Sequence, residues 1–365
     1  MVRGQGPMKS YRLAVILGDG IGKEVTPEGI RVLNLVAELS GSFQFEYKYF
    51  PWGCEYYMEH GRMMAIDGLK VLRDFDAILF GAVGFPTVPD HISLRGLRLA
   101  ICQSFDQYIC YRPSELLPGI RSPLANGETG AIDFVVIREN TEGEYTGAGG
   151  RAHRGLPNDI AVETSIFSRA GVERVVRYAF NLAQNRRKRL VSATKSNAQQ
   201  HALTFWDEIV DEVSRDFSEV RTESVLIDAL AARFVLNPQS LDVVVASNLF
   251  GDILTDLGAA ICGGLGIAPS GNINPERTYP SMFEPVHGSA PDIAGRGIAN
   301  PVGMIRSCAM MLDFLGEGEG AKMIEMSVRT VLQQRAVRTL DLGGSAGTTE
   351  FTNAVLSHLK KIGGK

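Results

Sequence analysis

Two carboxylates four residues apart give the clearest chemical signal in the sequence. Asp252 and Asp256 lie in the segment 248–256, NLFGDILTD, which follows the apolar run 242–246. On a helix, side chains at this spacing share one face about 5–6 Å apart. Carboxylate oxygens are the ligands that Mg²⁺ and Mn²⁺ prefer, and no Lys or Arg neighbours the pair in sequence. The spacing therefore indicates a divalent-metal site, with a solvated acidic helix face as the alternative.

Two arginines have the chemistry to hold an acidic substrate. Arg138 ends the apolar segment 132–137, so its guanidinium should stand at the edge of a sheet, where it can grip a carboxylate by two hydrogen bonds. Arg112 stands in an Arg-Pro pair. The alternative for Arg138 is an ion pair with one of the glutamates that follow it.

A glycine-rich segment, Gly18–Lys23, lies between an expected strand and an expected helix. It fails as a dinucleotide fingerprint because Lys23 stands where the third glycine is needed. It fails as a P-loop because Leu17 occupies the first glycine position and Glu24 follows the lysine. A tight strand-to-helix turn is the simpler interpretation.

A second loop-rich segment, 283–293, reads FEPVHGSAPDI. Its exposed backbone N–H groups and His287 could hold a phosphate or an adenine. Equally, Ser289 could be the N-cap of a plain helix with Pro291 in its first turn.

The elements that must position these residues alternate along the chain, which predicts an α/β fold with a largely parallel sheet. The expected strands are 12–17, 43–49, 76–82, 132–137, 189–193 and 242–246. The expected helices are 22 to about 39, 92–104, 169–184, 199–217, 249–261 and 304–315. Between 139 and 164 the helical period breaks, which suggests an extended arm or hairpin.

Composition limits the class of protein. The chain has 365 residues, enough for roughly two domains of about 150 residues. Its 37 Lys+Arg and 41 Asp+Glu give a net charge of −4, so neither nucleic-acid nor membrane-surface binding is expected. No apolar run reaches the ~18 residues of a membrane span, and no secretory signal is expected. The five scattered cysteines lack a C-x-x-C motif and are expected to be reduced thiols of a cytoplasmic protein.

Taken together, the motifs resemble one family, the β-decarboxylating dehydrogenases that include isopropylmalate, isocitrate, homoisocitrate and tartrate/D-malate dehydrogenases. The resemblance runs from about Arg12 to the C-terminal helix, and residues 1–7 are expected to be a loose tail. The strings at 51–64 and 89–94 are most similar to the tartrate/D-malate branch. The motifs that carry the resemblance are LGDGIGKEV (17–25), FDAILFGAVG (75–84), RP (112–113), IRENTEGEY (137–145), TKSN (194–197), NLFGDILTD (248–256) and FEPVHGSAPDIAG (283–295).

For the fold, the resemblance implies an isopropylmalate dehydrogenase-like α/β architecture of two domains with one shared mixed sheet, not a Rossmann fold. The large, cofactor-side domain would contain 1–107 and 265–365, and the small domain 108–264. The irregular stretch near 140–165 resembles an arm that interlocks two subunits, so a homodimer is implied.

For the catalytic centre, the resemblance implies roles position by position. Asp252 and Asp256 match the metal-binding pair, and Asp228 matches a third carboxylate donated by the neighbouring subunit. Lys195 matches the catalytic lysine, also donated across the dimer. Tyr145 matches the tyrosine that protonates the enolate left after decarboxylation. The implied metal is Mg²⁺ or Mn²⁺, with K⁺ as a further candidate whose need the sequence leaves open.

For the dinucleotide, the resemblance implies an adenosine-binding loop. Its Asp292 carboxylate can accept hydrogen bonds from ribose hydroxyls but would repel a 2′-phosphate, which favours NAD over NADP. The residues that match this loop are His287, Gly288, Ser289, Ala290, Asp292 and Asn300.

One departure from the family concerns its substrate arginines. Arg112 and Arg138 match two arginines that hold the carboxylate to be lost, but Cys102 stands where the third is expected, and a thiol cannot replace a guanidinium. Arg98 lies one helical turn earlier, where isopropylmalate enzymes carry an apolar residue. We therefore expect Arg98 to reach the substrate and supply the missing charge, with a solvated surface Arg98 and a Cys102 that simply packs as the alternative.

These observations predict an NAD-dependent, divalent-metal-dependent enzyme that oxidises and decarboxylates a (2R)-hydroxy dicarboxylic acid such as tartrate or D-malate. Two alternatives remain open. One is an isopropylmalate- or isocitrate-like dehydrogenase, and the other is a divergent, non-catalytic binding protein of the same fold.

Overall fold

The computed structural model describes residues 8–125 and 127–364, so the tail expected at 1–7 lies outside the described residues. The chain divides into two compact units. Unit 1 comprises Met1–Gln107, Glu115–Gly130 and Ala259–Lys365, and unit 2 comprises Tyr108–Ser114 and Ala131–Gly258. This division differs from the expected one in two places: the second crossover falls before Ala259, and the segment Glu115–Gly130 belongs to unit 1.

Unit 1 is built on five strands in the order β2-β1-β3-β12-β11. β1 is parallel to β2 and β3, and β12 is parallel to β3, whereas β11 is antiparallel to β12. Leu13 to Ile16 of β1 are fully buried, as expected for a central strand with an apolar run. The strands are β1 (Lys9–Gly18), β2 (Phe43–Phe50), β3 (Ala77–Ala82), β11 (Pro269–Ile273) and β12 (Ser281–Pro285).

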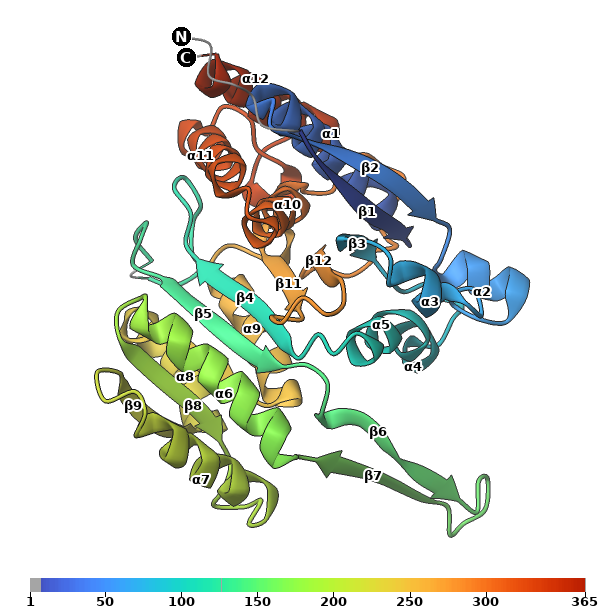
Figure 1. Cartoon of the computed structure of the whole chain (residues 1–365), viewed down its shortest axis with the longest axis vertical. Coiled ribbons are helices and arrows are strands. Elements are labelled where there is room, and N and C mark those ends of the chain that lie inside the picture. The colour runs from blue at the N-terminus through green and yellow to red at the C-terminus, as the bar shows by residue number, and fades with distance from the viewer. Residues whose placement is uncertain (1–7, 126, 365) are drawn as a thin grey trace. The chain divides into compact units, whose positions relative to one another are not determined.

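The helices of unit 1 fall into two groups (Figure 1). The first group packs together beside β1, β3, β11 and β12, and consists of α1 (Gly22–Ser40), α10 (Val302–Leu315), α11 (Gly318–Gln334) and α12 (Thr348–Gly363). The second group is shorter, and consists of α2 (Cys54–His60), α3 (Gly68–Leu72), α4 (Asp90–Ser93), a π-helical turn η1 (Leu94–Arg98) and α5 (Leu99–Ser104). Two 3₁₀ turns complete the unit, η3 (Leu265–Ile267) and η4 (Leu340–Leu342).

Unit 2 is built on five strands in the order β4-β5-β10-β8-β9. β10 is parallel to β5 and β8, and β8 is parallel to β9. The strands are β4 (Ile109–Glu115), β5 (Asp133–Glu139), β8 (Arg189–Thr194), β9 (Arg221–Leu226) and β10 (Val243–Ala246). The helices are α6 (Arg169–Gln184), α7 (Ala202–Ser214), α8 (Ile227–Leu236) and α9 (Asn248–Ile261), with a 3₁₀ turn η2 (Pro238–Ser240). α9 begins two residues after β10 ends, so its first turn stands at the carboxyl end of the parallel strands.

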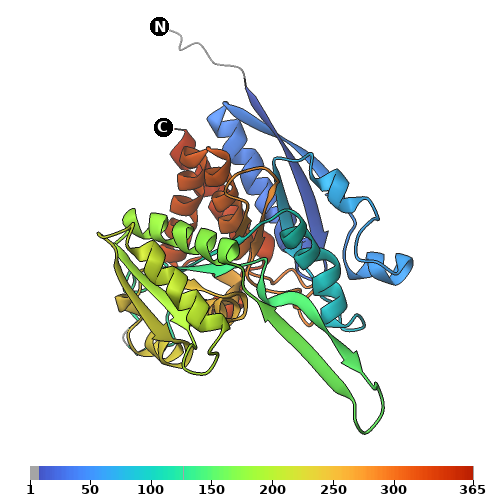
Figure 2. The ribbon, with the colours of Figure 1, turned by 60° about the horizontal axis from the view of Figure 1, so that its bottom comes forward.

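The segment that breaks the helical period is a β-hairpin. β6 (Gly143–Ala152) and β7 (Ile160–Ile166) pair antiparallel, with a register shift between Gly143 and Ala148. The hairpin extends away from the rest of unit 2 as a long ribbon in both views (Figures 1 and 2). β7 buries no hydrophobic face, because every one of its residues is exposed.

Most expected elements are present, and those that differ have physical reasons. The expected helix 92–104 is interrupted by the π-helical turn η1, which inserts a wider turn between α4 and α5. Four strands of the two sheets were not predicted, because they contain charged, Pro or Gly residues instead of an apolar run: β4 (ICYRPSE), β9 (RTESVL), β11 (PSGNI) and β12 (SMFEP). No described helix is long and apolar enough to cross a membrane.

Candidate functional site

Asp252 and Asp256 stand on one face of α9, and two arginines of unit 2 meet them there. Nη1 of Arg112 lies 3.4 Å from Oδ1 of Asp252 and 3.9 Å from Oδ1 of Asp256. The Arg138 guanidinium makes a closer ion pair with Oδ1 of Asp252. No Lys or Arg neighbours the two aspartates in sequence, and the guanidinium groups that offset their charge come from distant parts of the chain.

The two aspartates differ in environment. The side chain of Asp252 is 36% exposed and that of Asp256 is 61% exposed. Burial of the carboxyl group raises the pKa of Asp256, and the neighbouring charge of Asp252 adds to that rise while Arg112 and Arg138 oppose it. The carboxylate of Asp256 is therefore the more exposed of the two, and Arg112 and Arg138 balance its negative charge only in part.

Arg138 is held rigidly at the end of β5, where it is 1% exposed. Its Nε and Nη2 atoms donate to Oδ1 of Asn248 at 3.0 and 2.6 Å. Gly251 makes this approach feasible, because a Cβ at that position would lie 2.5 Å from Cβ of Arg138. Asn248 and Gly251 are positioning residues that the sequence patterns alone did not single out.

Tyr145, at the start of β6, completes the group in unit 2. Its hydroxyl donates to Oδ2 of Asp252 at 2.8 Å, and the Arg138 guanidinium lies 5.2 Å from the centre of its ring. Glu144 accepts hydrogen bonds from the Leu249 backbone N–H and the Ser247 hydroxyl, both at 3.0 Å. This carboxylate therefore fastens β6 to the N-terminus of α9.

The glutamates after Arg138 do not serve as its ion-pair partners. Glu139 accepts from the backbone N–H and hydroxyl of Thr141 at 2.8 Å, and Glu142 accepts from Ser168 at the start of α6. They fix backbone groups, and Arg138 is left directed at Asn248 and Asp252.

Lys195 and Asp228 form a second cluster in unit 2. Lys195 follows β8, Asp228 lies in the first turn of α8, and Nζ of the lysine is 2.8 Å from Oδ1 of the aspartate. The hydrogen bond from Lys195 lowers the pKa of Asp228. Among the described residues no three His, Cys, Asp or Glu side chains gather as a metal site, so Asp228 does not join Asp252 and Asp256 within one chain.

The segment 286–293 of unit 1 is a loop, so the alternative of a helix capped by Ser289 is wrong. It makes a turn in which the Ile293 N–H donates to the carbonyl of Ala290, whose φ is +40°. The carbonyl of Ser289 accepts from the Ile21 N–H at 2.8 Å, and a Cβ on Gly20 would lie 1.9 Å from that oxygen. A side chain at Gly20 would therefore clash with this loop, so close packing against the loop explains the glycine at this position of the turn.

His287 has the properties of a ligand-facing group. It is 9% exposed, and Nδ1 lies 2.9 Å from the carbonyl oxygen of Gly288, which assigns the proton to Nδ1. Burial lowers the pKa of the imidazole, so the ring is neutral and Nε2 is an acceptor. Among the described residues Nε2 has no hydrogen-bond partner, and a Cβ on Gly288 would meet nothing within 4 Å. Such a site suits a ligand that donates an N–H.

Two other expected cofactor residues lie in the same unit. Asp292 is exposed, which leaves its carboxylate accessible. Asn300 is 6% exposed, and its Nδ2 donates to Oδ2 of Asp341 at 2.9 Å while its Oδ1 accepts from the Val302 N–H at 3.0 Å. Asn300 thereby fixes the start of α10.

Arg98 does not carry the spare charge that we expected. Its guanidinium is buried and pairs with the carboxylate of Glu284 at 2.7 Å. Cys102 is fully buried in an apolar cluster with Leu97, Ile101 and Phe105. The thiol packs in the core, and the charge of Arg98 is balanced locally, so Arg98 does not replace an arginine missing at Cys102.

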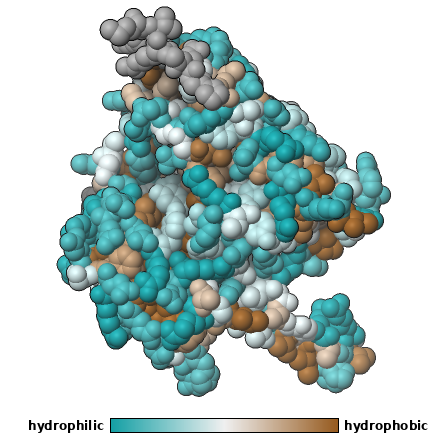
Figure 3. Space-filling model, in the orientation of Figure 1, coloured by the Kyte–Doolittle hydropathy of each residue, from teal (hydrophilic) through white to brown (hydrophobic). Residues whose placement is uncertain are grey.

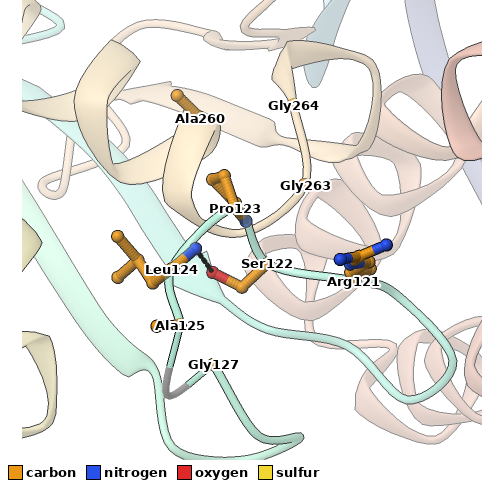
Figure 4. A pocket seen from close by; sticks show the side chains of 9 residues that line it. All are labelled: Arg121, Ser122, Pro123, Leu124, Ala125, Gly127, Ala260, Gly263 and Gly264. Carbon is orange, nitrogen blue, oxygen red and sulfur yellow. Dashed lines mark hydrogen bonds between the residues drawn. The ribbon is translucent and has the colours of Figure 1, made fainter.

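A cavity of about 670 Å³ in unit 1 is separate from these residues (Figure 4). It lies between the loop 121–127 and the end of α9, where Ala260, Gly263 and Gly264 form one wall. Within the loop, the Leu124 N–H donates to the Ser122 hydroxyl at 3.1 Å. None of the expected site residues lines this cavity.

Residues 12–355 match the isocitrate/isopropylmalate dehydrogenase family. A probable tartrate dehydrogenase/decarboxylase of Agrobacterium vitis is 53% identical over 349 residues, covering 95% of this chain and 97% of that protein. The D-malate dehydrogenase [decarboxylating] of Escherichia coli is 52% identical over 355 residues, covering 95% and 98%. A crystal structure of isocitrate dehydrogenase from Methylococcus capsulatus superposes with a TM-score of 0.84 at 30% identity, covering 96% and 99%. The chain belongs to the isocitrate/isopropylmalate dehydrogenase family.

Proposed function

We propose that this protein oxidises and decarboxylates a (2R)-hydroxy dicarboxylic acid such as tartrate or D-malate, with NAD as hydride acceptor and Mg²⁺ or Mn²⁺ bound. The observation that carries the proposal is the group formed by Arg112, Arg138, Tyr145, Asp252 and Asp256, which combines anion-binding, proton-transferring and cation-binding side chains in one unit. The names of the similar proteins support the substrate class.

The carboxylates Asp252 and Asp256, with Asp228 of a second subunit, would hold the divalent cation. Their oxygens are the donor type that such a cation prefers, and among the described residues of one chain no third carboxylate joins the pair. When bound, the cation would acidify the substrate hydroxyl and stabilise the charge of the enolate left by decarboxylation.

The arginines would bind the carboxylate that is lost as CO₂. A guanidinium has five N–H donors, and Arg138 uses one each from Nε, Nη1 and Nη2 on Asn248 and Asp252. The two remaining N–H groups of Arg138 would donate to a substrate oxygen. Arg112 is fixed beside it by a hydrogen bond of 2.7 Å from Nη1 to the Thr255 hydroxyl.

Proton transfer would fall to Lys195 and Tyr145. Lys195, donated by a second subunit, would take the hydroxyl proton as the C–H hydride leaves for NAD. The C–C bond to the departing carboxylate then breaks, and its electron pair forms the enolate. Tyr145 would protonate the enolate carbon, and its hydroxyl is held beside this site by its hydrogen bond to the Asp252 carboxylate.

Cofactor binding would fall to the loop of unit 1. His287 would accept an N–H of the adenine at Nε2, because that atom has no protein donor among the described residues. Asp292 would accept from the ribose hydroxyls, and Gly288, Ser289, Ala290 and Asn300 would complete the loop around the adenosine.

A homodimer is the state in which these sites would be complete. The β6–β7 hairpin exposes apolar side chains along its length (Figure 3), which are Leu156, Ile160, Val162 and Ile166 at 45–56% exposure. A second copy of the hairpin would cover them. A cytoplasmic location fits the five cysteines, all of which are buried.

The test is NADH formation with a panel of (2R)-hydroxy acids, Mn²⁺ and the purified protein. Tartrate or D-malate should give the highest kcat/KM, with one CO₂ released for each substrate fully processed. Higher efficiency with isopropylmalate or isocitrate would replace the substrate assignment. NAD binding without turnover on any of them would favour the non-catalytic alternative.

A further inference from the structure

We infer that Arg98 is a positioning residue for the dinucleotide loop, acting through Glu284. Glu284 lies near the end of β12, three residues before His287, so a group that fixes its carboxylate also fixes the start of the loop 286–293. The inference rests on the proposed function for the identity of the ligand. It assigns Arg98 to the cofactor side of the site, in place of the substrate-binding role expected from the sequence.

Three buried side chains, those of Arg98, Asn272 and Glu284, are linked by hydrogen bonds here. Nε of Arg98 donates to Oε1 of Glu284 at 2.7 Å, and Nη2 donates to Oδ1 of Asn272 at 3.1 Å. Nδ2 of Asn272 in turn donates to the same Oε1 at 2.7 Å. The side chains of Arg98 and Glu284 are only 9% and 7% exposed. Charge-assisted hydrogen bonds in so dry a setting hold both partners firmly.

The π-helical turn before α5 determines that Arg98 points toward Glu284 and Asn272. Arg98 is the last residue of the π-helical turn Leu94–Arg98, and α5 begins directly after it. A π turn adds a residue to the helix and so changes which side chain faces inward. Cys102 of α5 points into the apolar cluster, while Arg98 reaches the polar network between β11 and β12. Cys102 therefore contributes to the apolar core, whereas Arg98 contributes to the polar network.

β12 connects the fixed carboxylate of Glu284 to the loop 286–293, which follows it directly. The carbonyl of Glu284 accepts from the Ser307 hydroxyl at 2.8 Å, and the Val286 N–H donates to the carbonyl of Ala268 at 2.9 Å. After Val286 the loop has no strand or helix hydrogen bonds, and Ser289 is held by the Ile21 N–H. The loop is therefore anchored at its start by β12 and at Ser289 by the glycine-rich turn.

Charge balance gives Arg98 a second effect on the loop. The negative charge of Glu284 raises the pKa of His287, and Asp341 acts in the same direction, against the larger lowering caused by burial. With Arg98 in place, the Glu284 charge is compensated within the network. Without Arg98, the buried carboxylate of Glu284 would lose a charged partner, which favours its protonation, the entry of water or a change in its position. Each outcome displaces the residues that precede His287.

The experiment compares Arg98→Leu, Arg98→Lys and Arg95→Leu. Arg95 is the matched control, because it lies in the same π-helical turn but is exposed. Three quantities are measured: the dissociation constant for NADH in the absence of substrate, kcat at saturating NAD, and amide hydrogen exchange of 286–293 in the free protein. The double variant R98L/E284Q removes both charges and keeps the test decisive if R98L alone folds poorly.

R98L should weaken NADH binding at least tenfold and speed exchange in 286–293, with kcat at saturating NAD within about threefold of wild type. R98K should recover part of the affinity, because it restores the charge but not the planar fork, and R95L should match wild type. R98L/E284Q should bind NADH more tightly than R98L. Unchanged affinity and exchange in R98L, or equal losses in R95L, would overturn the inference. A wild-type protein that binds no NADH would overturn the proposed cofactor, while the exchange measurement would still decide whether Arg98 orders the loop.

Discussion

Tyr145 and Asp252 share a hydrogen bond of 2.8 Å between the phenol and one carboxylate oxygen, although 107 residues separate them in the chain. The other oxygen of the same carboxylate meets Arg138. Asp252 therefore joins the proposed proton donor to a proposed anion-binding arginine. A cation bound at Asp252 would compete with both contacts, so metal binding, substrate binding and the orientation of Tyr145 should be coupled.

Asp252→Asn and Asp256→Asn should each lower Mn²⁺ affinity and reduce kcat/KM by on the order of 100-fold or more. The reason is that a bound cation would contribute several kcal/mol of transition-state stabilisation. Calorimetric Mn²⁺ titration and steady-state kinetics check this. Asp211→Asn, an exposed aspartate of α7, serves as the control. Wild-type Mn²⁺ affinity in both variants would remove the metal from this position.

NAD should be preferred over NADP by at least about tenfold in kcat/KM, equivalent to about 1.4 kcal/mol. The exposed carboxylate of Asp292 would accept from a ribose hydroxyl and repel a 2′-phosphate. Asp292→Ala should lower the ratio of kcat/KM with NAD to kcat/KM with NADP. Substitution of Asp67, an exposed aspartate elsewhere in unit 1, by Ala should leave that ratio unchanged. Equal efficiency with both dinucleotides in the wild-type protein would show that Asp292 does not face the ribose.

Mixing two inactive variants should restore activity if the sites are shared between subunits. Lys195→Ala and Asp252→Asn remove groups from separate clusters of one chain. A hybrid dimer would contain one site with both residues intact, so random mixing should recover roughly one quarter of wild-type activity. Activity is measured after verified subunit exchange. No recovery in confirmed hybrids would mean that each site is built from a single chain.

His287 should make the protein less stable in mild acid. Burial lowers the pKa of its imidazole below the ordinary value of 6.5, with opposing contributions from Glu284 and Asp341. Between the folded pKa and 6.5, the unfolded chain binds a proton that the folded chain does not. The free energy of unfolding therefore falls as pH drops through this window, by at most about 1.4 kcal/mol per pH unit from this group.

Urea unfolding at several pH values from 7.5 to 5 measures that slope. His287→Gln should flatten it, because glutamine does not titrate, while substitution of the exposed His60 should leave it unchanged. A His287→Gln protein with the wild-type slope would place the responsible proton elsewhere.

The sequence alone was sufficient for the elements whose signal is local. The apolar run of β1, the periodic helices α1 and α6, and the position of the 143–166 hairpin follow from patterns within a few residues. The spacing of Asp252 and Asp256 placed both on one helix face for the same reason. β9 and β11 escaped because their pairing partners, not their own composition, make them strands.

Only the tertiary structure determined which charged side chains form ion pairs. Arg112 and Arg138 reach Asp252 across 140 and 114 residues, and no neighbouring position in the sequence reveals those pairs. The same holds for Arg98 and Glu284, 186 residues apart. Helical spacing alone placed Arg98 beside Cys102, yet the π-helical turn and the carboxylate of β12 determine where its guanidinium lies. A buried charge goes to the partner that compensates its loss of water, and that partner is fixed by how strands and helices pack.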